Sequence, residues 1–144
     1  MNDVYNTIRL HVPESIELVL DSCKFVIIQT DKNRLMQILI NLLTNAIKHT
    51  THGYIRFGYE IEERNVKFYV SDTGKGIPME AQEKIFDRFV QLNDATQGIG
   101  LGLPICKGLL LKLGGNISVT SEINKGSTFT FTLPLIHRGI KKWD

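Results

Sequence analysis

The chain begins with short stretches in which apolar and polar residues alternate. Residues 8–12, 16–20 and 25–28 are rich in β-branched and other aliphatic side chains, and this pattern predicts three strands. Residues 1–6 are mostly polar and show no periodicity. We therefore expect the folded part of the chain to begin close to Ile8.

The next segment has the apolar spacing of a helix. Apolar residues recur three or four positions apart, at Leu35, Ile38, Leu39, Leu42 and Ala46. Asp31 is suited to cap the N-terminus, because its carboxylate can accept hydrogen bonds from the free N–H groups of the first turn. The pattern predicts a helix from Asp31 to about Lys48, with one face in the core, ending before His52 and Gly53.

Strand and helix patterns alternate along the rest of the chain. They predict an antiparallel hairpin at 54–61 and 66–70, a short helix at 79–84, a second long helix at 101–113, and two final strands at 116–121 and 128–133. Gly114 and Gly115 are expected to end the second long helix. The order of elements predicts an α/β (α+β) two-layer sandwich, in which about three helices cover one face of a mixed β-sheet.

Composition and charge narrow the class. The 144 residues are 42% hydrophobic, which fits one globular domain with one core. Seventeen basic and fifteen acidic residues leave a net charge of +2 and predict no nucleic-acid surface. No apolar run approaches the length of a membrane span, so we expect no direct membrane contact from this segment. Cys23 and Cys106 fit neither a metal site nor a disulfide framework, and indicate reduced thiols in a cytosolic compartment.

Three groups of residues have the chemistry of a nucleotide site. In the first group, Asn41, Asn45 and Lys48 share one face of the first predicted helix, with His49 at its rim. Carboxamide oxygens are suitable ligands for Mg²⁺, and an ammonium group neutralises phosphate oxygens. Taken alone, the same residues also fit the solvated side of an amphipathic helix.

The second group is the loop at residues 72–77, directly after a predicted strand. Gly74 and Gly76 allow a sharp turn and the close approach of a flat ligand. The carboxylate of Asp72 can accept a hydrogen bond from an exocyclic amine such as that of adenine. An ordinary Asp-Gly turn would have the same composition.

The third group, residues 98–103, opens the second long helix. Gly98, Gly100 and Gly102 expose consecutive backbone N–H groups, and a helix N-terminus adds a positive partial charge that favours phosphate. The motif is neither a P-loop nor a dinucleotide fingerprint, and a flexible hinge is the alternative interpretation. Pro104 is expected in the first turn of this helix, where proline is tolerated.

In this order and spacing, these groups strongly resemble the ATP-binding domain of sensor histidine kinases, within the superfamily shared with DNA gyrase, heat-shock chaperones and MutL. The matching segments are the N box at 41–50, the first glycine box at 72–76, the F box at 86–89, the second glycine box at 98–102 and the last box at 126–129. The resemblance covers about residues 8–134. It implies an ATP-grasping fold of the Bergerat type.

The resemblance implies a role for each matched position. Asn45 is expected to ligate Mg²⁺ with Asn41 beside it, and Lys48 to contact phosphate oxygens. Asp72 is expected to bind the adenine amine, aided through water by Thr128. The residues expected to contact ATP are Asn41, Asn45, Lys48, His49, Asp72, Gly74, Gly76, Ile77, Phe89, Gly98, Ile99, Gly100, Leu101, Gly102, Leu103 and Thr128.

Two positions depart from the family pattern. Relatives usually have threonine where this chain has Ile99, so a hydroxyl contact in the second glycine box is lost. Many relatives have arginine where this chain has Gln91, which leaves open which cation, besides Mg²⁺ and Lys48, meets the γ-phosphate.

Domain organisation and partners are also implied by the resemblance. Residues 1–7 would be the end of a linker from a helical dimerisation and phosphoacceptor domain, residues 8–136 the ATP-binding domain, and residues 137–144 a tail or linker. The phosphoacceptor histidine would lie on the separate helical domain and pass phosphate to the receiver domain of a response regulator. The parent is expected to be a bacterial inner-membrane sensor, with this domain in the cytoplasm.

Three other functions stay open from the sequence. A free-standing serine kinase of the anti-sigma type has a similar domain, although the F box argues against it. An ATPase module of the gyrase or chaperone kind uses glutamate where this chain has Asn41, and an amide cannot act as a general base. A nucleotide-binding module without catalysis is compatible with Ile99 and Gln91.

Overall fold

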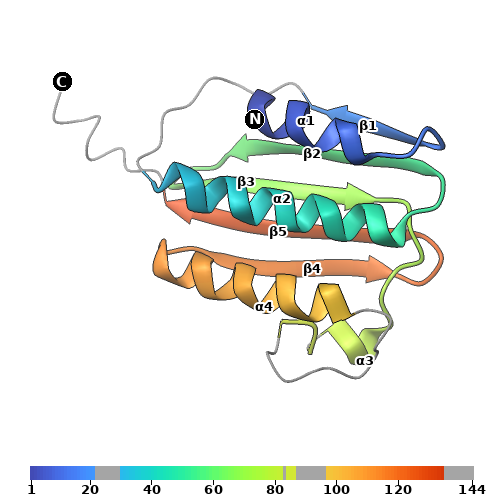
Figure 1. The fold of residues 1–144 in the computed structure, drawn as a ribbon. Coiled ribbons are helices and arrows are strands. Elements are labelled where there is room, and N and C mark those ends of the chain that lie inside the picture. Colours follow the sequence, from blue (N-terminus) through green and yellow to red (C-terminus); the bar gives the residue numbers. More distant parts are fainter. Residues whose placement is uncertain (22–29, 83, 87–96, 135–144) are drawn as a thin grey trace, which may run out of the picture.

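The computed structural model describes residues 1–21, 30–82, 84–86 and 97–134, with residues 97–102 described by their backbone. Within these residues five strands form one mixed sheet in the order β1-β2-β3-β5-β4 (Figure 1). The strands are β1 (Ile16–Leu20), β2 (Gly53–Ile61), β3 (Asn65–Asp72), β4 (Asn116–Glu122) and β5 (Gly126–Pro134). β1 pairs with β2 in parallel, and the remaining neighbours are antiparallel.

The helices cover one face of this sheet. They are α1 (Asn2–Ile8), α2 (Lys32–His49), α3 (Met79–Gln82) and α4 (Gln97–Lys112), and a 3₁₀ turn, η1 (Arg9–His11), follows α1. In Figure 1, α2 and α4 lie next to each other in front of the sheet, and α1 lies over β1 and β2. The described part of the chain is thus a two-layer sandwich, and the predicted fold class is confirmed.

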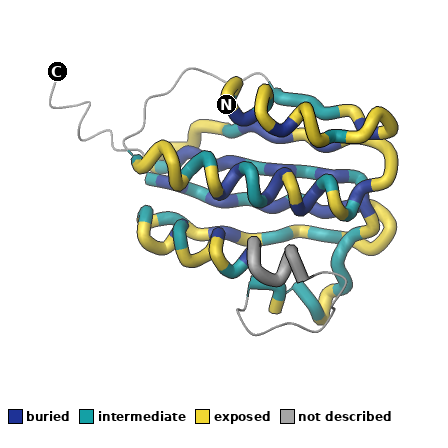
Figure 2. Tube along the Cα trace, viewed as in Figure 1, coloured by how far each residue is buried: buried dark blue, intermediate teal, exposed yellow. Residues whose placement is uncertain are grey.

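The core fills the space between the helices and the sheet, where Figure 2 shows the buried residues gathered. Alternate residues of β3 and β5 face this core, and their rings pack on each other, with the centroids of Phe68 and Phe131 4.8 Å apart. Ile38, Leu39 and Leu42 of α2 close the core from the helix side. Removing this apolar area from water is the main force that holds the two layers together.

The start of α2 forms as its sequence predicts. One carboxylate oxygen of Asp31 accepts hydrogen bonds from the backbone N–H groups of Asn33 (3.0 Å) and Arg34 (3.2 Å). These bonds satisfy two N–H groups that have no partner inside the helix. The helix then runs without interruption to His49, and the chain turns to an extended conformation at Thr50.

The first prediction that the structure contradicts concerns the start of the chain. The strand expected at 8–12 is wrong, because residues 2–11 form α1 and the 3₁₀ turn. Val4 and Ile8, four positions apart, are each only 2% exposed and belong to the core, whereas Leu10 is 75% exposed. The helix is favoured because it turns both buried side chains to the same side. The strand expected at 25–28 lies outside the described residues.

The second difference is at α4, which begins at Gln97 and not near residue 101. Gly98, Gly100 and Gly102 therefore lie within its first turns. Pro104 lies inside the helix and not in the first turn. Proline has no N–H to donate to the carbonyl four residues earlier, so the hydrogen-bond ladder of α4 lacks one bond close to its glycines.

None of the helices in the described part of the chain is both long and apolar enough to cross a lipid bilayer.

Candidate functional site

Three backbone ends meet at one end of the sandwich. The C-terminal end of α2, the C-terminal end of β3 and the N-terminal end of α4 all lie at the same side of the sheet in Figure 1. The residues predicted to bind a nucleotide lie mainly on these three segments. The topology therefore brings together positions that are about twenty-five to fifty residues apart in the sequence.

The polar face of α2 forms one side of this site. Asn45 is buried, with 7% of its surface exposed, and its side-chain oxygen has no hydrogen-bond partner among the described residues. The same is true of the hydroxyl of Thr50, just beyond the helix. Leaving a buried polar atom without a partner costs about 1–3 kcal/mol. Asn45 is the residue that the sequence predicts as a metal ligand, and a bound cation or a water would give its oxygen a partner.

Asn41, one turn earlier, lies against α4. Its side chain forms a hydrogen bond with the thiol of Cys106, which is buried and also contacts the carbonyl oxygen of Ile38 at 3.8 Å. Burial raises the pKa of the Cys106 thiol to about 11, and the contact with Asn41 opposes this shift. The thiol is therefore protonated and unreactive near neutral pH, and Asn41 ties the nucleotide face of α2 to the next helix.

Asp72, the last residue of β3, is a buried carboxylate. It is 7% exposed, and its Oδ1 accepts a hydrogen bond from the N–H of Gly74 at 2.8 Å. Burial raises the pKa of Asp72, and hydrogen bonds from the backbone N–H groups of Gly74 and Ser127 oppose that shift. These bonds fix the direction of the carboxylate, while its burial leaves it short of solvation.

The loop after Asp72 closes tightly on the end of α2. A Cβ atom at Gly74 would lie 2.2 Å from the carbonyl oxygen of His49, which only glycine avoids. The N–H of Lys75 donates to that same oxygen at 3.2 Å. Gly76 has φ +79°, and a Cβ there would lie 2.2 Å from the carbonyl oxygen of Glu122. Both glycines are thus required by the geometry of the loop.

His49 lies at the junction of this loop and α2. Its pKa is lowered to about 4, first because the ring is partly buried, and then because the ammonium groups of Lys75 and Lys48 repel a proton on it. The imidazole is therefore neutral at physiological pH. A neutral, half-buried ring between two cations suits contact with an uncharged flat group of an anionic ligand.

A hydrogen-bond network joins the loop at residues 72–77 to the neighbouring strands and to α3. The N–H of Ile77 donates to the hydroxyl oxygen of Ser121 at 2.7 Å, and that hydroxyl lies 2.8 Å from the hydroxyl of Ser127. The side-chain amide of Gln82, in α3, donates to the carbonyl oxygens of Ile77 (2.8 Å) and Ser121 (3.2 Å). Ile77 is thus held by β4 and α3, and Ser121 connects it to β5.

The strand register separates Thr128 from this group. Thr128 is opposite Ser71, and their hydroxyl oxygens lie 2.7 Å apart, whereas Asp72 is opposite Ser127. Successive side chains of a strand point to opposite faces, so Thr128 lies on the face of the sheet away from the helices and from Asp72. Ser127, which the sequence did not single out, pairs with Asp72, and matching the last residue of β3 with the first residues of β5 would have identified it.

Other predicted positions fall into three sets. Leu103 is 1% exposed and belongs to the core, where it lies on the same side of α4 as Cys106 and Leu110. Phe86 packs edge-on against Phe129, with ring centroids 6.1 Å apart, which supports a role in the core. Phe89 and Gln91 lie outside the described residues, as do the side chains of Ile99 and Leu101.

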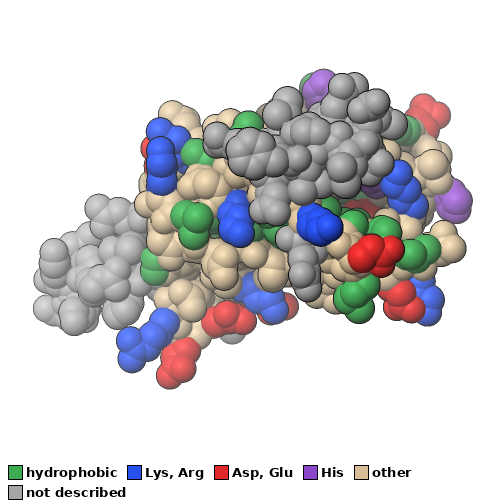
Figure 3. Space-filling model, turned by 90° about the horizontal axis from the view of Figure 1, so that it is seen from below, with side chains coloured by type: hydrophobic (Ala, Val, Ile, Leu, Met, Phe, Trp, Pro, Cys, Tyr) green, Lys and Arg blue, Asp and Glu red, His purple; other side chains and the backbone are tan. Residues whose placement is uncertain are grey.

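The charged residues around the site are mixed in sign. In the view of Figure 3, from the side of α4, Lys and Arg side chains and Asp and Glu side chains are scattered over the visible face. This distribution agrees with the small net charge of +2. The visible face therefore carries charges of both signs rather than a field of one sign.

The fold and the site together define an ATP-grasping domain. Residues 30–137 match the family model described as histidine kinase-, DNA gyrase B-, and HSP90-like ATPase. The chain belongs to this family, as the sequence predicted.

Curated relatives of the chain are histidine kinases. Hybrid signal transduction histidine kinase B of Dictyostelium discoideum is 40% identical over 144 residues, which cover 90% of this chain and 7% of that protein. The aerobic respiration control sensor protein ArcB of Escherichia coli K12 is 42% identical over 110 residues, which cover 72% of this chain and 14% of ArcB. The chain thus spans only a small part of the length of these relatives.

Solved structures of histidine kinases share the fold. The nucleotide-free catalytic domain of the histidine kinase ThkA superposes with a TM-score of 0.82 at 29% identity, covering 93% of this chain and 89% of that domain. Full-length ShkA in complex with AMPPNP gives a TM-score of 0.81 at 33% identity, covering 93% of this chain and 29% of ShkA.

Proposed function

We propose that this chain is the ATP-binding catalytic domain of a two-component sensor histidine kinase. It would bind Mg²⁺-ATP and present the γ-phosphate to a histidine on a separate helical dimerisation and phosphoacceptor domain, from which a response-regulator receiver domain takes the phosphate. One observation carries the proposal: a buried carboxylate, a buried amide oxygen with no partner among the described residues, and a helix N-terminus lie at one end of the sheet. The histidine kinase relatives support histidine as the acceptor.

Adenine recognition is assigned to Asp72 and its neighbours. The N–H groups of Gly74 and Ser127 hold the carboxylate in one direction, so an oxygen of Asp72 can accept a hydrogen bond from the adenine amine. The hydroxyl of Ser127, and not that of Thr128, is on the correct face to assist through water. Guanine would bring a carbonyl oxygen towards the carboxylate, and the two would repel each other.

Phosphate binding is assigned to the end of α2 and the start of α4. Lys48 extends from the last turn of α2, and the first N–H groups of α4 have no partners within the helix. Together they provide one full and one partial positive charge for the triphosphate. The glycines at the start of α4 allow phosphate oxygens to approach this backbone closely.

Asn45 fits the role of a Mg²⁺ ligand. Its side-chain oxygen is buried and has no hydrogen-bond partner in the part of the chain that the structure describes, and Asn41 lies one turn away on α2. No group of three or more His, Cys, Asp or Glu side chains converges in the part of the chain that the structure describes. The donor set is therefore one or two amide oxygens, with phosphate oxygens and water completing it, as Mg²⁺ commonly has in nucleotide sites. When bound, Mg²⁺ neutralises charge on the phosphate oxygens during transfer.

The site positions the γ-phosphate but has the amide Asn41 where an ATPase of the gyrase kind has its glutamate base. Asn41 is a neutral amide and cannot remove a proton from an attacking water, so hydrolysis is expected to be slow. In the proposed reaction a nitrogen of the acceptor histidine forms a bond to the γ-phosphorus. The bond to the bridging oxygen breaks, and ADP leaves with the electron pair. The chain contributes orientation and charge neutralisation.

A transfer assay tests this function. The purified chain is incubated with γ-labelled ATP and Mg²⁺, alone and with the isolated helical domain of a histidine kinase relative. The proposal predicts no labelling of the chain alone and acid-labile label on the helical domain, which indicates phosphohistidine. Acid-stable label on a serine substrate would favour the anti-sigma type, and rapid ATP hydrolysis would favour the gyrase type. The same proposal assigns the domain to the cytoplasmic side of a membrane sensor.

A further inference from the structure

Lys75 has an unusually well-fixed backbone for an exposed residue. Its N–H donates to the carbonyl oxygen of His49 at 3.2 Å, and its own carbonyl oxygen accepts from the N–H of Asn124 at 2.7 Å. The glycines on either side pack directly against the backbone of His49 and Glu122. Lys75 is therefore held at the contact between the end of α2 and the turn that joins β4 to β5.

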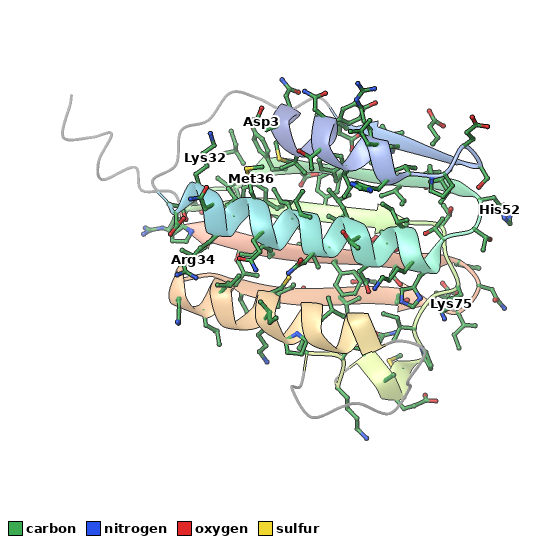
Figure 4. The ribbon with its side chains drawn as sticks, viewed as in Figure 1. Asp3, Lys32, Arg34, Met36, His52 and Lys75 are labelled. Carbon is green, nitrogen blue, oxygen red and sulfur yellow. The ribbon has the colours of Figure 1, made fainter. Side chains whose placement is uncertain are left out.

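The side chain of Lys75 extends from this fixed point beside the nucleotide site. Figure 4 shows Lys75 next to the C-terminal end of α2. Its ammonium charge acts on the ring of His49 from the loop, as Lys48 does from the helix. Among the described residues, neither lysine forms an ion pair with a carboxylate. Two cations without anionic partners thus flank the half-buried ring.

The C-terminal end of α2 needs positive charge if it is to receive phosphate. A helix C-terminus carries about half a negative charge, which opposes an anionic ligand. Lys48 offsets this charge, and about half a positive charge then remains at this end of α2 to attract a triphosphate. Lys75 places a second cation on the adjacent loop and increases the positive charge available to phosphate at this end of α2.

We propose that Lys75 is a second phosphate-binding cation of the nucleotide site and acts with Lys48 to favour nucleotides over uncharged nucleosides. This role rests on the proposed function, because it assumes that the site holds ATP. Lys75, a loop residue, would thus add to the preference for phosphate-bearing ligands that Lys48 and the start of α4 provide. The alternative is that Lys75 stabilises only the end of α2, without contact to a ligand.

Binding measurements on the whole chain separate these roles. Calorimetric titrations with Mg²⁺-ATP, ADP and adenosine are compared for the wild type, Lys75→Met, Lys75→Arg and Lys112→Met. Lys112 provides the matched loss of one charge, because it is an exposed residue in the last turn of α4. We expect Lys75→Met to weaken ATP and ADP binding about threefold to fivefold at low salt, the scale of one exposed ion pair, and to leave adenosine binding unchanged. Lys75→Arg and Lys112→Met should bind like the wild type.

The difference should also disappear when the salt concentration is raised to about 0.5 M, because exposed charges are then screened. Unchanged ATP affinity in Lys75→Met would overturn the proposal, and so would an equal loss for ATP and adenosine, which would indicate a disturbed loop. If the wild type itself binds no ATP, the proposed function fails. If the wild type binds ATP and Lys75→Met binds it equally well, only the role of Lys75 fails.

Discussion

Replacing Asp72 with asparagine should make the empty domain no less stable and yet weaken nucleotide binding. The pKa of Asp72 is raised by burial, which means that its ionised form is disfavoured in the folded state. The sign follows from linkage: an acid whose folded pKa is raised destabilises the fold above its unfolded pKa and does not below it. At pH 7 the carboxylate therefore costs stability, and a neutral amide removes that cost.

The same substitution affects adenine binding in the opposite direction. The asparagine oxygen can still accept a hydrogen bond from the N–H of Gly74, which in the wild type lies 2.8 Å from Asp72 Oδ1. The new amide NH₂ group, however, meets the adenine amine donor to donor. An unsatisfied buried donor costs about 1–3 kcal/mol, which corresponds to roughly a fivefold to hundredfold rise in Kd. ATP, ADP and adenosine should lose the same factor, because the contact involves only the base.

Two measurements test this pair of expectations. Urea denaturation of the empty domain at pH 7 should give Asp72→Asn an unfolding free energy equal to or above that of the wild type. Calorimetry should show the weaker binding of all three ligands. Asp72→Asn with wild-type affinity would show that the carboxylate does not contact adenine. A large loss of stability would instead mean that Asp72 is mainly a structural residue.

Other substitutions test the remaining parts of the site. Gly74→Ala places a Cβ 2.2 Å from the carbonyl oxygen of His49 and should cost about 1–3 kcal/mol of unfolding free energy. Gly108→Ala, where a Cβ would meet nothing within 4 Å, should be neutral or stabilising in the same denaturation assay. Equal effects of the two substitutions would contradict the close contact between the loop and α2. Asn45→Ala should weaken Mg²⁺-ATP binding about tenfold and leave adenosine binding unchanged. Thr44→Ala, at the exposed neighbouring position, should change the affinity for neither ligand. Loss of adenosine binding in Asn45→Ala would indicate a damaged helix. The His49 ring should titrate by NMR near pH 4. Because a depressed histidine pKa favours the neutral folded form, stability should fall as the pH drops from about 6.5 to about 4. A midpoint near 6.5 would contradict both the burial of the ring and the influence of the flanking cations.

The fold was predictable where one periodicity dominates. Asp31 followed by the apolar stripe of α2 specifies both the cap and the buried face, and the alternation in β2 and β3 specifies their pairing. The start of the chain was not predictable in the same way. Residues 8–12 alternate like a strand, but the helix buries both Val4 and Ile8 against the core, and only the tertiary contact decides between the two.

The site was predictable where chemistry and chain order agree, and less so where register decides. The sequence singled out both Asp72, which is buried, and Asn45, whose side-chain oxygen has no hydrogen-bond partner among the described residues. Thr128 and Ser127 are adjacent and chemically alike, and only the pairing of β3 with β5 shows which one faces Asp72. Leu103 was assigned to the nucleotide because of its place in a glycine-rich motif, but the helical twist of α4 turns it into the core.

The central claim is that Mg²⁺-ATP binds between the ends of α2 and β3 and the start of α4, and mapping the binding site by NMR tests it most directly. Amide chemical shifts are followed by NMR as Mg²⁺-ATP is added, with GTP as the control. The site described here predicts saturable shifts in residues 45–50 and 72–77 and at the first turns of α4, and much smaller shifts at Ser118 and Thr130 on the opposite face of the sheet. The account would be contradicted if ATP shifted mainly that opposite face, or if GTP produced the same saturable changes as ATP.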